Sequence, residues 1–90
     1  VEKMLLKVFA IKDKAIDSYS APFTQATIES GIRMFRELIT YDQTENKYRR
    51  SPEDYALYYI GEYNDVTGEM MSHEIQRLSS VVEIITEKET

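Results

Sequence analysis

The chain has 90 residues, the length of one domain, and 42% of them are hydrophobic while 30% are charged. Seven Tyr and three Phe argue against a disordered chain, because disorder goes with few aromatic residues. The net charge of −5 argues against a protein that coats nucleic acid by charge alone and disfavours anionic membranes, and it leaves room for a local basic patch. The absence of Cys excludes disulfides and thiolate chemistry.

The first segment, residues 4–11, combines β-branched and aromatic residues in a short run, which is typical of a strand. Its apolar run is too short for a membrane-spanning helix and lacks the cleavage pattern of a signal peptide. We expect a loop over residues 12–22 to follow it. Both sides of this strand are apolar, with Leu6 and Val8 on one side and Leu5, Phe9 and Ile11 on the other.

Residues 27–40 show the clearest helical period, and Gly31 inside this segment suggests a close approach to the sheet. The helix costs about 1 kcal/mol for that glycine relative to Ala. Its apolar face is formed by residues at spacings of three and four, namely Ile28, Ile32, Phe35 and Ile39.

The segment 41–51 is polar and has no period, so we expect a mobile loop. A single helical turn is predicted at Ser51-Pro52-Glu53-Asp54, because Ser suits an N-cap and Pro the first helical position. Residues 55–63 are predicted to form the second strand, with four Tyr among nine residues.

The rest of the chain begins with turn chemistry at residues 64–68, where Gly68 can take a positive φ. Residues 69–72 then return as the third strand of the sheet. The segment 74–85 has helical apolar spacing, but its β-branched pairs allow a strand end instead. We expect residues 87–90 to be frayed.

The order of these elements predicts one α+β domain over residues 1–90, with the topology β-α-β-β and a short C-terminal helix. One long helix is expected to pack on one face of a three-stranded sheet. If the first two strands lie parallel and side by side, the crossover between them should be right-handed.

The second strand carries large apolar side chains on both faces, with Ala56, Tyr58 and Ile60 on one side of the strand. A single helix covers one face only, so the other face is expected to meet a partner, most simply a second copy of the chain. The alternatives are partial cover by the C-terminal segment, or tyrosines that lie solvated on a wet sheet. The predicted oligomer interface is Tyr55, Leu57, Tyr59, Leu5 and Phe9, and Gly61 and Tyr63 are assigned to the same side as Tyr55.

A basic stretch with an aromatic residue among its charges is the candidate nucleic-acid site. Exposed Tyr rings can stack on unpaired bases, and Lys and Arg can neutralise phosphates. The competing interpretation is a solvated basic loop and tyrosines that pack in the core. The residues assigned to this site are Lys47, Tyr48, Arg49 and Arg50, with Arg33 and Arg36 extending it from the helix.

The chain lacks a recognisable catalytic or metal-binding motif. His73 is the only His and has no Ser or acid placed beside it by a motif, so a surface His is the simpler interpretation. The three glycines are scattered and form no phosphate-binding loop. We therefore expect no enzyme activity, no cofactor, no metal and no small-molecule substrate.

The stretch from Ser51 to Asp65 carries a resemblance to a known family. With Pro52, Glu53, Asp54, Tyr55, Leu57, Ile60, Gly61, Tyr63, Asp65 and Gly68, the chain resembles the small nonstructural protein of gokushovirus-type microviruses, the single-stranded DNA phages of bacteria. Weaker matches lie at Asp13-Lys14-Ala15, at Pro22-Phe23 and at Arg33 with Phe35. The resemblance implies a viral setting and an accessory role in DNA binding, DNA synthesis or packaging, without a catalytic residue.

Two functions are compatible with these observations. The first is an oligomeric accessory protein that binds single-stranded DNA or the viral replication or packaging proteins. The second is an acidic protein-interaction module that engages a host or viral protein without nucleic acid. In either case we expect no membrane association and a location in the cytoplasm of the bacterial host.

Overall fold

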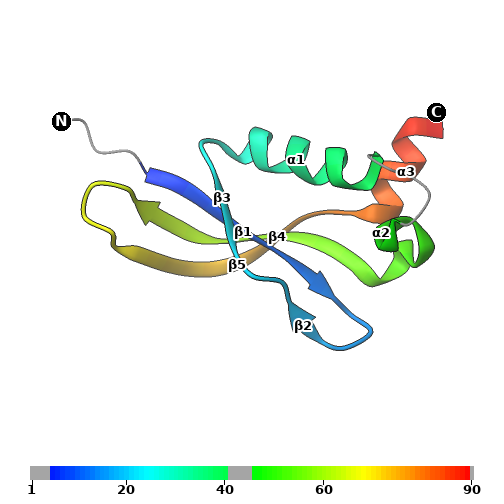
Figure 1. The fold of residues 1–90 in the computed structure, drawn as a ribbon, viewed down its shortest axis with the longest axis horizontal. Coiled ribbons are helices and arrows are strands. Elements are labelled where there is room, and N and C mark those ends of the chain that lie inside the picture. The colour runs from blue at the N-terminus through cyan, green and yellow to red at the C-terminus, as the bar shows by residue number, and fades with distance from the viewer. Residues whose placement is uncertain (1–4, 41–45, 90) are drawn as a thin grey trace.

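The computed structural model describes residues 5–40 and 46–89 and shows an α+β fold (Figure 1). In chain order, the elements are β1 (Leu5–Asp13), β2 (Ser18–Tyr19), β3 (Phe23–Gln25), α1 (Ile28–Thr40), α2 (Lys47–Arg50), the 3-10 turn η1 (Pro52–Asp54), β4 (Tyr55–Asn64), β5 (Met70–Ser80) and α3 (Val81–Glu89). The helix predicted at 27–40, the turn before residue 55 and the second strand are confirmed. The strand predicted at residues 4–11 is confirmed from Leu5 onward, and Met4 lies outside the described residues.

The sheet has five strands in the described part of the chain, in the order β2-β1-β4-β5, with β3 pairing with β1 beside β2. The prediction of three strands is therefore wrong, because the expected loop at 12–22 contains β2 and leads into β3. Each pairing is antiparallel. The short return through β2 and β3 reverses the chain before α1, so β4 runs antiparallel to β1 and the condition for a parallel crossover does not arise.

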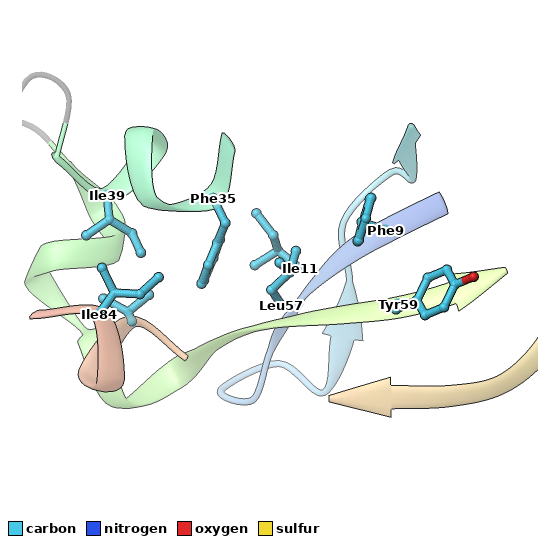
Figure 2. Packing of buried hydrophobic residues seen from close by; sticks show 8 residues of the cluster. Phe9, Ile11, Phe35, Ile39, Leu57, Tyr59 and Ile84 are labelled. Carbon is cyan, nitrogen blue, oxygen red and sulfur yellow. The ribbon is translucent and has the colours of Figure 1, made fainter. Parts of the chain in front are cut away.

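The main core lies between the sheet and two helices, because α1 and α3 both pack on the same side of the sheet (Figure 1). Apolar residues of β1 and β4 meet one face of each helix there, as Figure 2 shows. Burial of this face is the main source of helix stability, since propensity contributes little by itself. The fully buried side chains include Phe9, Phe35, Ile39, Leu57, Val81 and Ile84.

Gly31 is the point of closest approach between α1 and the sheet. A Cβ built there would lie 2.3 Å from Cζ of Phe9, whose ring is fully buried. The predicted reason for this glycine is confirmed, because any larger side chain would overlap the ring.

Two segments in the second half of the chain, residues 47–50 and 74–85, differ from the prediction. Residues 47–50 form α2 instead of a mobile loop, while residues 41–45 lie outside the described part. β5 continues to Ser80, so segment 74–85 is partly strand and partly helix. The hydroxyl of Ser80 accepts from the amide of Glu83 (3.2 Å) and caps α3, which extends to Glu89, while Thr90 lies outside the description.

Candidate binding surfaces

A bulge in β4 changes which face of the sheet the following side chains occupy. Phe9 pairs with Tyr59 but Val8 pairs with Gly61, so Ile60 has no partner in β1. The bulge shifts Gly61 and Tyr63 away from the face that α1 covers, which corrects their predicted assignment. We call the face opposite α1 the far face.

The predicted oligomer interface does not lie on an exposed surface. Phe9 and Leu57 are fully buried beneath the helices, and Tyr59 is 8% exposed. Tyr55 packs edge-on against Tyr48, and Leu5 is half-buried at the start of β1. Since three of the five side chains fill the protein's own core, a second copy cannot contact them in this fold.

The far face carries a groove that was not predicted. Its floor contains Ala10, which is buried although no helix covers it, and Ile60 of the bulge. Tyr19 and Ile75 line it and are 42% and 50% exposed. The cavity measures about 480 Å³ and is mostly apolar, with Ser20, Ser72 and His73 as its polar residues.

A second, smaller cavity adjoins the groove along the same face. It measures about 150 Å³ and shares Ile60 and Ser72 with the first. Gly61 lies in its wall, and a Cβ there would come within 2.3 Å of the carbonyl oxygen of Met71. The absence of a side chain at Gly61 therefore lets β5 approach β4 closely at this point.

Two cationic residues lie at paired strand positions of the far face, and each forms an ion pair with an acidic residue of the same chain. Lys12 lies 3.3 Å from Asp17, and Arg77 pairs with Glu83. The hydrogen bond with Asp17 raises the pKa of Lys12. The ammonium of Lys12 also lies 5.5 Å from the ring of Tyr19. The face is thus apolar with its cations locally compensated.

The second candidate surface is the basic turn, which we define as Lys47, Tyr48, Arg49 and Arg50 of α2. Asn46 positions it: the side-chain amide donates to the carbonyls of Leu38 and Ile39 at the end of α1, and its oxygen accepts from the amide of Tyr48. One side chain therefore holds the end of α1 and the start of α2.

Tyr48 anchors the basic turn to the sheet. Its ring lies 4.9 Å from that of Tyr55 in an edge-on arrangement, and the ammonium of Lys47 lies 5.3 Å from the Tyr48 ring. Burial raises the pKa of Tyr55, and the nearby carboxylate of Asp13 adds to this effect. A cavity of about 140 Å³ lies beside these residues and is also lined by Lys47.

The cations of the basic turn differ from the two on α1 in their surroundings. Within residues 5–40 and 46–89, Lys47, Arg49 and Arg50 form no ion pair. Arg33 instead lies 3.5 Å from Glu37 on the same helix. The structure brings together the four predicted residues of the basic turn, and it places Arg33 and Arg36 on a separate element, α1.

His73 lies within β5 and is partly buried, so it is not the surface residue that was expected. Its ring packs edge-on against Tyr59 at 4.3 Å, and Nδ1 lies 2.8 Å from the carbonyl oxygen of Glu74. The described residues contain no group of three His, Asp or Glu side chains that could hold a metal ion. In the same residues, no helix is long and apolar enough to span a bilayer.

Comparison with known families decides the identity of the chain. The sequence model of the family described as phage ORF5 protein matches residues 6–84. The chain belongs to the phage ORF5 protein family. The comparison of this phage protein with curated proteins gave no match, and neither did its comparison with solved structures.

Proposed function

We propose that this phage protein is a non-enzymatic accessory protein that acts as an assembly of copies in the replication or packaging of a single-stranded DNA genome. In this proposal it works in the cytoplasm of the bacterial host and contacts DNA through the basic turn. Membership of a phage protein family supports the viral setting. The observation that carries the DNA contact is the group of three cations in α2 without an acidic partner in the described chain.

The physical case rests on how single strands are bound. Phosphates are neutralised by Lys and Arg, and aromatic rings provide stacking surfaces worth about 1–3 kcal/mol per base. Lys47, Arg49 and Arg50 present three charges within four residues, beside the ring of Tyr48. Because the whole chain carries a charge of −5, the contact is confined to this site and should weaken steeply with salt.

The test is fluorescence anisotropy of a labelled single-stranded oligonucleotide over a series of salt concentrations. Three phosphate contacts predict a slope of about −2 in log affinity against log salt, since each contact contributes about −0.7 for a single strand. Arg49→Ala should reduce the slope by about 0.7. Arg77→Ala removes one charge from the far face and should leave it unchanged. Absence of salt-sensitive binding at tens of micromolar would refute the proposal.

A second candidate function is favoured by the acidic character of the chain, whose net charge is −5: a module that binds a host or viral protein without nucleic acid. Affinity capture from infected host lysate, with and without nuclease, separates the two. A partner that stays bound after nuclease treatment supports the interaction module, and a partner lost with the nucleic acid supports DNA binding.

A further inference from the structure

We propose that the far face binds a second copy of this chain, so that two sheets stack face to face around a two-fold axis. This inference rests on the assembly of copies in the proposed function and names the interface of that assembly. It does not depend on the DNA contact, because the basic turn takes no part in the groove. It also replaces the interface predicted from the sequence, three of whose five residues fill the core.

The first support is that the helices cover one face of the sheet and leave the far face uncovered. Both α1 and α3 pack on one side, so the C-terminal segment does not shelter the other (Figure 1). Tyr19, Ile75 and Met70 remain 42%, 50% and 57% exposed, and the last pairs in register with Tyr63 on the far face. Apolar side chains gathered along one groove mark an interaction site more often than isolated ones do.

The second support is the size of the face. The long strands run along the longest dimension of the molecule, which is 43 Å, and its shortest dimension is 22 Å (Figure 1). The far face is carried by long strands such as β4 and β5, of 10 and 11 residues, which are about 33 Å long at about 3.3 Å per residue. Its area is therefore of the order of the roughly 800 Å² that each partner buries in a standard interface. A second copy therefore finds enough surface for stable association.

The third support is charge, which selects among occupants. Lys12 and Arg77 are each compensated by an acid of their own chain, so two far faces can meet without repulsion between these cations. For the same reason the face offers phosphates no uncompensated cation at its paired positions, which disfavours nucleic acid here. Glu74, in the unpaired part of β5, is exposed in the edge strand.

The fourth support is shape. Each copy has an open groove of about 480 Å³ together with half-exposed side chains that line it, Tyr19 and Ile75. Stacked sheets pack about 10 Å apart with interdigitated side chains, so the side chains of one copy can enter the groove of the other. Because the same patch is used on both copies, the assembly closes at two chains.

Sedimentation equilibrium of the full chain tests the proposal. We expect a mass of twice 10.5 kDa at high micromolar concentration, with reversible dissociation on dilution. Ile75→Asp places a charge in the groove and should raise the dissociation constant at least tenfold. Val82→Asp is the matched control, because Val82 is 45% exposed on α3, on the opposite side of the sheet.

The outcomes are distinguishable from those of the DNA proposal, which is measured separately. Circular dichroism checks that each variant folds, and Ile75→Ser serves as a milder change if Ile75→Asp does not. A dimer that is weakened by either Ile75 variant and unaffected by Val82→Asp supports the proposal. A single-chain mass at several hundred micromolar, an assembly larger than two chains, or equal effects at Ile75 and Val82 would overturn it.

Discussion

Replacing Gly31 by Ala should destabilise the protein, although Ala is the better helix former. Helix propensity favours Ala by about 1 kcal/mol at an interior position. The new Cβ, however, would lie 2.3 Å from Cζ and 2.5 Å from Cε2 of Phe9, whereas carbon atoms pack at about 3.5–4.0 Å. Overpacking of a core costs about 1–3 kcal/mol, and the ring of Phe9 is fully buried against Phe23 and Tyr59.

The overlap involves three ring atoms, so we place its cost at the upper end of that range and expect Gly31→Ala to lose about 1–2 kcal/mol overall. Urea unfolding followed by circular dichroism measures this loss, and thermal unfolding should show about 4–8 °C per kcal/mol for a chain of this size. The same substitution in a Phe9→Leu background is the control, because leucine lacks the three overlapping atoms. There it should be neutral or stabilising. An increase in stability in the natural background would refute the reasoning.

Three further predictions concern a cap, a strand crossing and an ion pair. Asn46→Ala removes bonds from both α1 and α2 and should cost about 1–2 kcal/mol in urea unfolding. Gly61→Ala should cost about 2–3 kcal/mol, because its Cβ meets the backbone of Met71 and no flexible side chain can yield; a neutral effect would contradict the tight crossing. Lys7 lowers the pKa of Glu62 through a 2.8 Å hydrogen bond, so ionised Glu62 stabilises the folded state. Glu62→Gln should therefore be less stable than the natural protein near pH 7, and this difference in unfolding free energy should vanish as the pH falls through the folded-state pKa of Glu62. A difference that persists in acid would exclude the ion pair as its cause.

Local signals were sufficient for the elements that depend on nearby residues. The apolar stripe of α1 follows from the spacing of its apolar residues. The turn before β5 follows from Gly68, which adopts a positive φ of 81°. β2 and β3 have two and three residues, too few for an alternation to be seen, and they form because β1 offers its free edge. β5 extends to Ser80 because pairing with β4 outweighs a helical spacing.

The candidate surfaces show the same difference between features set by neighbouring residues and features set by the tertiary fold. The basic turn was found because its residues are neighbours in sequence, and Asn46 before it is a capping signal that could have predicted α2. The oligomer interface was assigned to the buried face because alternation distinguishes two faces but does not say which one the helix covers. Tyr19 and Ile75 were missed because the fold, through the bulge at Ile60 and the return of β2, brings them to one groove.

The claim on which the account depends is that the far face is bare in one chain and covered in a pair. The chain contains no Cys, so Ile75→Cys and Val82→Cys each create a single reactive thiol, and labelling by a thiol reagent can be timed at low and high protein concentration. We predict that labelling at position 75 slows as concentration rises, while labelling at position 82 keeps a constant rate. Equal rates at both positions over the whole concentration range would contradict the account.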